Sequence, residues 1–353
     1  MKGTVLAGRL REAAGKVYDA LPQTAVDVLG TAHPLLALAQ DGLVPLAIAR
    51  GRCATTAAPA SALIAGRGTD ARYFLERFFS GPIEVEDRGR VSLTRLPAAL
   101  RRERDRHDLT IARVDRIGSR FLFDAAYHRL PDWVGTIMSM PNDVERFAST
   151  SPRRLRSDFL RVRRNDLRWL ISNAREDFDR FYTKMYLPFL DRRHGALGVV
   201  RNVHQLLRAF RAGCLLWVLH RGEPISAILL TPQGDVLRFV VLGTRDGALE
   251  PIALGGLAAL YIFAMEYAKE RGFRSLDLGG VRPCLSDGAL QYKLKWGVRL
   301  RPKPEVYHDF LFYWPRPSKE ISSFLEANPL VVRRGNELVS LGGEGCSILK
   351  KWE

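Results

Sequence analysis

In residues 276–297 the chain reads Leu276-Asp277-Leu278-Gly279-Gly280, then Asp287-Gly288-Ala289-Leu290-Gln291-Tyr292-Lys293, then Trp296-Gly297. Leucines that alternate with Asp277 predict a strand over 274–278. The double glycine after this strand lets another group approach the backbone closely, because glycine has no Cβ. Asp287 stands where a helix N-cap is expected, so a short helix is predicted over 288–296. The stretch therefore predicts a strand, a glycine turn open to a ligand, and a short helix.

A long helix and a three-stranded meander are expected directly before this stretch. The helix runs from about Pro251 to Glu270, with apolar residues at helical spacing, and Gly272 fits its end. Turn sequences rich in glycine and proline separate three extended runs at hairpin spacing. These runs cover residues 214–220, 225–231 and 236–242.

Three helices are expected before the meander, over 155–173, 176–192 and 202–210. The first is rich in arginine, and a solvated basic face is one explanation of that run. The second carries an aromatic stripe formed by Phe178, Phe181, Tyr182, Tyr186 and Phe189. His194 and Gly195 follow it, and Gly195 is expected to end the helix in the αL conformation.

The first 150 residues give a weaker pattern. Residues 1–50 are expected to be helical and 51–68 to form a loop. The segment 131–152 contains three prolines and is taken as a boundary. Between them we expect helices at 71–79, 97–106 and 118–130, and extended segments at 83–93 and 109–114. Further extended segments are expected at 298–301 and 305–314.

The composition is that of a globular protein with an excess of positive charge. The chain has 353 residues, enough for two domains, and its net charge is +16. Such charge raises the affinity for polyanions, although surface arginines also occur without that role. The four cysteines fit neither a zinc site nor a disulfide framework, and no apolar run is long enough to span a bilayer. We expect a cytoplasmic protein, and a weak peripheral contact with a membrane is left open.

The order of the expected elements resembles the GNAT acyltransferase fold. The likeness is strongest to its Fem-type branch, the peptidoglycan aminoacyltransferases, and to related acyltransferases of cellulose and polysaccharide gene clusters. The motifs that carry it are Ala268 to Gly272 at a helix end, Asp277 to Gly280, and Gly288 to Gly297 with Lys293 between two aromatic residues. The resemblance implies an α+β fold of tandem GNAT-like halves, with mixed, mostly antiparallel sheets flanked by helices. It implies an N-terminal helical extension (1–50), a degenerate half (51–150), an acyltransferase domain (151–315) and a tail that packs back (316–353).

The resemblance also implies a site between the fourth and fifth strands, which part in a GNAT sheet and admit the acyl donor. These strands would be 236–242 and 274–278. Lys293 is expected to stabilise an oxyanion or a phosphate there, with Asp277 and His194 as alternative general bases. Each of these two candidate bases also has a structural explanation. Asp277 can bind loop amides, and His194 can complement a helix end. The expected substrate-binding residues are Tyr182, Gly243, Arg245, Gly279, Gly280, Arg282, Asp287, Tyr292 and Trp296.

The donor is expected to be aminoacyl-tRNA, with acyl-CoA as the alternative. CoA-dependent members usually carry an Arg/Gln-x-x-Gly-x-Gly/Ala loop after the fourth strand. The stretch from Gly243 to Pro251 does not match this loop, and Glu250 would repel a phosphate. We therefore expect transfer of an aminoacyl group to an acceptor amine without a metal or other cofactor. A non-catalytic module that binds RNA or an anionic carrier is a further alternative.

Overall fold

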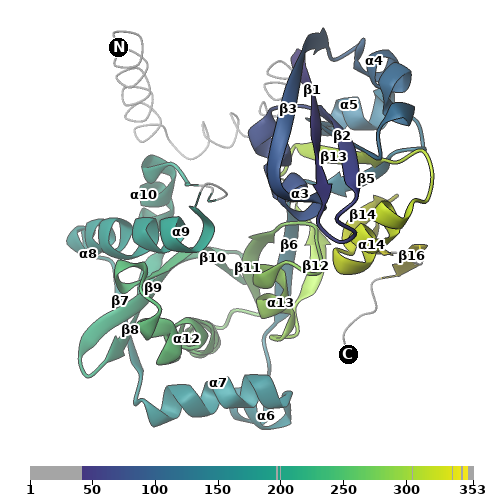
Figure 1. Cartoon of the computed structure of the whole chain (residues 1–353). Coiled ribbons are helices and arrows are strands. Elements are labelled where there is room, and N and C mark those ends of the chain that lie inside the picture. Colours follow the sequence, from purple (N-terminus) through teal and green to yellow (C-terminus); the bar gives the residue numbers. More distant parts are fainter. Residues whose placement is uncertain are drawn as a thin grey trace. The chain divides into compact units, whose positions relative to one another are not determined.

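The computed structural model describes residues 42–348, except 196, 197, 199, 304, 336, 343 and 344 (Figure 1). These residues form an α+β protein with two mixed sheets flanked by helices. The described chain divides into two compact units. Unit 1 contains Thr136–Gly279 and Lys293–Arg299, and unit 2 contains residues 42–135, Gly280–Tyr292 and residues 300–348.

Unit 1 is built on a seven-stranded sheet with the order β12-β6-β11-β10-β9-β8-β7. Its strands are β6 (Val134–Ser139), β7 (Arg168–Ser172), β8 (Cys214–His220), β9 (Glu223–Gln233), β10 (Val236–Thr244), β11 (Ser275–Val281) and β12 (Arg299–Pro302). Its helices are α6 (Val144–Thr150), α7 (Arg153–Arg164), α8 (Arg175–Phe181), α9 (Leu187–His194), α10 (Val203–Arg211), α11 (Glu250–Ala253), α12 (Gly256–Glu270) and α13 (Gly288–Leu294). Helix α13 and the strands β6, β11 and β12 contain residues of both units. From β7 to β12 the elements follow the order expected from the sequence, with β7 as an additional strand.

Unit 2 contains a nine-stranded sheet with the order β16-β15-β14-β5-β13-β4-β2-β1-β3. Its strands are β1 (Leu43–Cys53), β2 (Pro59–Ala65), β3 (Phe79–Ser92), β4 (Leu109–Asp115), β5 (His128–Pro131), β13 (His308–Tyr313), β14 (Leu330–Arg334), β15 (Glu337–Gly342) and β16 (Gly345–Ile348). Its helices are α3 (Gly68–Phe78), α4 (Leu96–Glu103), α5 (Arg116–Leu122) and α14 (Lys319–Ala327).

Each sheet includes a strand that is remote in sequence from its neighbours. In the seven-stranded sheet β6 lies between β11 and β12. In the sequence, both of these strands come after the three-stranded meander and α12, far from β6. In the nine-stranded sheet β13 lies between β4 and β5. It pairs with β4 from His308 opposite Asp115 to Tyr313 opposite Thr110. The two sheets are therefore completed by an exchange of strands between the first and second parts of the chain.

The core of each unit is rich in aromatic side chains. In unit 1, Phe178 and Phe181 pack with Trp217 and with the apolar face of the meander. Helix α12 is buried over most of its circumference, which agrees with its apolar composition. In unit 2, the ring of Phe74 makes edge-to-face contacts with Phe310 and Phe312 of β13. The inserted strand thus contributes directly to the core of unit 2.

The expected meander is confirmed, and so are the helix near 71–79 and the strands near 83–93 and 109–114. The long helix expected over 251–270 is confirmed from Gly256 to Glu270, but Gly255, with a φ of 98°, separates it from the short helix α11. The helix expected over 155–173 is wrong in its second half. Helix α7 ends at Arg164, where Asp166 takes a positive φ of 43°, and the chain then forms β7. β7 pairs along its whole length with β8, so tertiary pairing overrides the local helical pattern.

Three further expectations about the first part of the chain are wrong. Residues 43–50 belong to β1, which is paired on both sides by β2 and β3, and not to a helix. The expected loop 51–68 contains β2. The helix expected over 118–130 ends at Leu122. Residues 1–41 lie outside the described residues, and the division into four domains stays a prediction.

Candidate active site where two strands part

The strands β10 and β11 are paired only at their beginning. They run parallel, with Val236 opposite Ser275, Leu237 opposite Leu276 and Arg238 opposite Asp277. Within the described chain no pair joins them beyond Arg238, although β10 continues to Thr244 and β11 to Val281. The backbone groups of β10 that face β11 beyond this point are therefore not used by a ladder between the two strands.

The backbone of β11 turns away from β10 at Gly279. This residue has a φ of +81°, a conformation that glycine adopts readily. Its N–H donates to Oδ1 of Asp277 at 2.9 Å, and its carbonyl accepts from the hydroxyl of Thr136 on β6 at 2.7 Å. Both main-chain groups of Gly279 are thus satisfied without β10, so neither is needed for a ladder with that strand.

Strand β10 is also irregular at this point. Its register with β9 shifts between Phe239 and Val241, so Val240 forms a bulge. A bulge increases the local twist of a strand and bends it. The bulge on β10 and the glycine on β11 occur at the same level of the sheet, because Phe239 directly follows the last paired residue, Arg238.

Lys293 lies beside the parting. Its Nζ would be 3.9 Å from a Cβ placed on Gly279, and the carbonyl oxygen of Phe239 would be 3.5 Å from the same Cβ. Gly279 therefore lies between the ammonium group of α13 and the backbone of β10. The structure brings together Gly279 and Lys293, two of the residues predicted from the sequence, with Asp277 below them.

Asp277 is almost fully buried, with 1 % of its surface exposed. Besides the N–H of Gly279, its carboxylate faces the guanidinium of Arg238, with 3.8 Å between Nε and Oδ2. A buried carboxylate needs such partners to offset the loss of hydration. Asp277 thus holds the glycine turn and β10 in position, and sequence reasoning did not find Arg238 as its partner.

Gly243 is explained by helix packing. A Cβ at this position would be 2.5–2.7 Å from the backbone of Met185 and Tyr186. These residues belong to a π-helical segment, Tyr182–Tyr186, between α8 and α9. The space expected for a ligand on that side of Gly243 is thus filled by the protein. π-helical turns often mark functional regions, and no residue pattern in the sequence indicates this one.

Tyr182 and Arg245 lie near the same helical segment of unit 1. The ring of Tyr182 stacks on Phe178 and is tilted against Tyr186, and burial raises the pKa of its hydroxyl. Arg245 begins a short turn after β10 and lies 3.8 Å from Glu250. Glu250 is the carboxylate that the sequence predicted to repel phosphate, and here it neutralises the nearby arginine.

The aromatic residues of α13 and the following turn lie in different surroundings. Trp296 is fully buried and stacks on Tyr261 of α12 at 4.9 Å between ring centroids. Lys295 bonds to Asp158 of α7, so it points away from Lys293, as the helical spacing predicts. Tyr292 is half-buried. Trp296 therefore anchors the turn after α13 in the core of unit 1.

Gly280, Arg282 and Asp287 belong to unit 2. Arg282 donates to Asp132 at 2.5 Å, stacks over Trp133, and shares Asp132 with Arg113. Asp287 caps α13 by accepting from the N–H groups of Ala289 and Leu290, as expected, and also accepts from the hydroxyl of Tyr73.

Both charged groups therefore have protein partners within unit 2. A Cβ on Gly280 would contact Trp133 and Lys303 at 3.3 Å. Lys303 is buried and donates to Glu305 at 2.8 Å, and sequence reasoning missed it.

His194 is the last residue of α9. Gly195 ends that helix with a φ of 47° and a ψ of −129°, so its φ is positive but the expected αL conformation is wrong. Across the described residues no three His, Cys, Asp or Glu side chains lie close enough to hold a metal ion. In the part of the chain that is described, no helix has the length and apolar character needed to cross a membrane.

Known proteins resemble this chain in structure but not in sequence. No family of known proteins matches the sequence, and no curated protein does. Among solved structures, FemX is similar with a TM-score of 0.41 and 12 % identity, over 82 % of this chain and 93 % of that one. L-PGS from Bacillus licheniformis is similar with a TM-score of 0.35 and 14 % identity, over 78 % and 86 % of the two chains. The ribosomal-protein-S18-alanine N-acetyltransferase from Escherichia coli has a TM-score of 0.28 and 13 % identity, over 41 % and 91 %.

Proposed function

We propose that the protein is an acyltransferase that moves an aminoacyl group from aminoacyl-tRNA to an acceptor amine. The observation that carries the proposal is the parting of β10 and β11, with the ammonium group of Lys293 beside Gly279. An activated carbonyl group seated in this parting would meet unused backbone groups of β10 on one side and a positive charge on the other. Such preorganised groups stabilise the charge that develops on a carbonyl oxygen during acyl transfer.

In the proposed reaction the acceptor nitrogen attacks the carbonyl carbon of the aminoacyl ester. The new C–N bond forms, and the carbonyl oxygen becomes an oxyanion that Lys293 stabilises. The C–O bond to the ribose then breaks, the carbonyl is restored, and the proton lost by the amine is taken up by the leaving ribose oxygen. The reaction needs no oxidant, no metal and no covalent intermediate with the protein.

We assign Asp277 a positioning role in this proposal. Its carboxylate is occupied by the N–H of Gly279 and by Arg238, and it is buried. It therefore keeps the glycine turn in the conformation that parts the strands. His194 stays a predicted general base, and Tyr182 and Arg245 stay predicted substrate contacts.

The proposal is tested by supplying the protein with two panels of donors labelled in the acyl group, aminoacyl-tRNAs and acyl-CoAs. The acceptors are a lysine-containing peptide, glucosamine and a small diamine, which represent three classes of amine. We expect label to pass from an aminoacyl-tRNA to one of these amines. Transfer from acyl-CoA alone would refute the proposed donor, and no transfer from either panel would refute the enzymatic function.

A further inference from the structure

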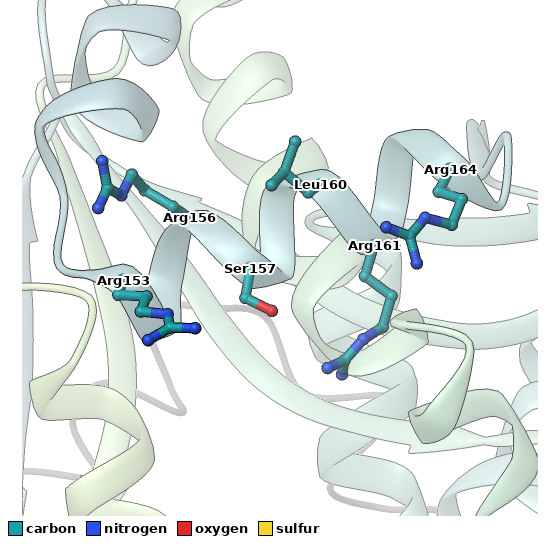
Figure 2. A pocket seen from close by; sticks show the side chains of 6 residues that line it. All are labelled: Arg153, Arg156, Ser157, Leu160, Arg161 and Arg164. Atoms are coloured by element: carbon teal, nitrogen blue, oxygen red, sulfur yellow. The ribbon is translucent and has the colours of Figure 1, made fainter.

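One face of α7 is lined by arginines that the proposed chemistry does not use. Arg153, Arg156, Arg161 and Arg164, with Ser157 and Leu160 between them, line a hollow of about 480 Å³ (Figure 2). Counted from Arg153, the other five residues lie three, four, seven, eight and eleven positions further on, which places all six on one side of a helix. We call this surface the α7 arginine face.

The opposite side of α7 is fixed to unit 1. Leu155, Phe159 and Val162 are buried there, and Phe159 contacts the ring of Trp296. The stem of Arg161 is close to Gly255, where a Cβ would be 3.3 Å from Cγ of the arginine. The arginines are therefore displayed by a rigid helix, which lowers the entropy lost when they bind a ligand.

Most of the positive charge on this face is not neutralised by the protein. Among the described residues, Arg153, Arg156 and Arg164 make no ion pair or hydrogen bond with a side chain. Arg161 is 4.0 Å from Asp158, whose carboxylate also binds Lys295. By contrast, Arg163 on another side of the same helix pairs with Glu145. The electrostatic potential in the hollow is therefore positive, which favours the binding of an anionic ligand.

We propose that the α7 arginine face binds the phosphate backbone of RNA, which in the proposed function is the tRNA that carries the donor. Arg153 and Arg164 are eleven residues apart, about 16 Å along the helix axis. A single phosphate cannot reach all four guanidinium groups, whereas successive phosphates of a nucleic acid can. Arginine also matches a phosphate with two parallel hydrogen bonds.

The same face is poorly suited to a membrane. Helices that bind at a lipid surface bury a broad apolar face between the headgroups. The apolar side of α7 is used by the core of unit 1, and Leu160, 59 % exposed, is the large apolar residue on the arginine face. The surface is also hollowed, whereas a bilayer is flat. These features favour a nucleic acid over anionic lipid.

The test measures binding of deacylated tRNA, which cannot take part in transfer. The variant replaces Arg153, Arg156, Arg161 and Arg164 with glutamine, which keeps the helical propensity. The matched control makes the same change of charge at four exposed arginines of unit 2, Arg67, Arg90, Arg95 and Arg102. Both proteins are compared with the parent by fluorescence anisotropy at several salt concentrations, after thermal unfolding has shown equal stability.

We expect the α7 variant to bind tRNA at least roughly tenfold more weakly than the control at about 0.1 M salt. The slope of log K against log salt should become shallower by about 3–4, because each of the four lost phosphate contacts removes nearly one unit. Equal weakening in both variants would overturn the proposal. It would also fall if the α7 variant lost binding to vesicles of anionic phospholipid but bound tRNA like the parent.

The outcome is separable from that of the proposed function. If the α7 variant loses tRNA binding but the parent transfers no aminoacyl group, the RNA site stands and the enzymatic function fails. If the parent transfers from aminoacyl-tRNA and the α7 variant binds tRNA normally, the function stands and this site is wrong.

Discussion

The pairs β10–β11 and β2–β4 are both parallel pairs inside a mixed sheet, but they end differently. β2 pairs with β4 from Ala62 opposite Leu109 to Ala65 opposite Ala112. Ala65 is the last residue of β2, so the pairing continues to the end of that strand. β10 and β11 separate after three pairs although both strands continue. The closed pair is lined by buried apolar residues, whereas the open pair has Asp277 beneath it and Lys293 beside it. The comparison shows that the same pairing can serve as core or as a site, depending on where the ladder stops.

The largest expected effect is on Lys293, which has no counterpart at the closed pair in this comparison. Replacing it with methionine keeps the length of the side chain but removes the charge. Since loss of one group that stabilises an oxyanion costs about 10²–10³-fold in rate, kcat should fall by that factor while donor binding persists. The exposed Lys269→Met of α12 is the control and should keep the parental rate. A fall of less than about tenfold for Lys293→Met in single-turnover kinetics would contradict the role.

The next effect concerns Thr136 on the inserted strand β6. Its buried hydroxyl donates to the carbonyl of Gly279, so Thr136→Val leaves that carbonyl without its partner. We expect a loss of about 1–3 kcal/mol in the free energy of unfolding, measured by denaturant titration.

Thr110→Val on β4 is the matched control at the closed pair. Thr110 is also fully buried, and its hydroxyl has no hydrogen-bond partner among the described residues. This substitution should leave the free energy of unfolding unchanged or raise it, because it removes an unsatisfied polar group. Equal losses in the two variants would show that the hydroxyl of Thr136 does not hold the parting.

Two glycines with positive φ allow a closer comparison. Gly279 lies at the open pair, and Gly66, with a φ of 115°, follows the closed one. Alanine at either position should cost about 1–2 kcal/mol of unfolding free energy because of the backbone conformation. Crowding against Arg113 adds to the cost at Gly66, where a Cβ would have contacts at 3.3 Å.

The activities should separate the two variants. Gly279→Ala should slow transfer by more than its stability loss explains, because the new Cβ lies between Phe239 and Lys293. Gly66→Ala should transfer at the parental rate at a temperature where it is folded. A parental rate for Gly279→Ala would mean that the substrate does not pass near this residue.

The smallest effect is expected at Asp309 on β13. This strand lies between β4 and β5, which are remote from it in sequence, as β6 lies between β11 and β12 in the seven-stranded sheet. Burial raises the pKa of this carboxyl, although Arg333, Arg116, Ser119 and Arg129 lower it in part. The charged form is therefore disfavoured in the folded protein. The stability contributed by the neutral form is fully present below the unfolded pKa of about 4 and is lost as pH rises through the folded pKa.

Asp309→Asn should thus raise the free energy of unfolding by less than about 1 kcal/mol at pH 7. The difference should shrink as the pH falls toward about 4, and denaturant midpoints at several pH values will measure it. A destabilised variant at pH 7 would show that the attraction between Asp309 and the arginines outweighs burial.

The sequence predicts the part of the fold that depends on local pattern. The meander and α12 are defined by apolar periodicity and by turn residues, and they lie where expected. β7 was missed because Arg168 to Ser172 follow an arginine-rich helix without a glycine or proline, and Asp166 alone marks the break. The strand exchange depends on pairing between distant segments, which no local pattern reports.

The same limit applies to the candidate site. Gly279, Asp277 and Lys293 were found because they are close together in the sequence and stand in recognisable motifs. Thr136 and Arg238 were missed because their roles arise only when β6 and β10 lie beside β11. The π-helical segment against Gly243 was missed because its backbone geometry follows from packing and not from composition.

The position of β13 has a consequence for biosynthesis. The neighbours of this strand, β4 and β5, leave the ribosome long before residues 308–313 have been translated. Until then β4 and β5 lack the strand that pairs with both of them, and Phe74 lacks its contacts with Phe310 and Phe312. Pairing between segments so distant in sequence also forms slowly. We expect the nascent chain to expose unpaired strand edges and apolar surface for most of its synthesis. The order of its strands therefore predicts that folding during translation depends on chaperones.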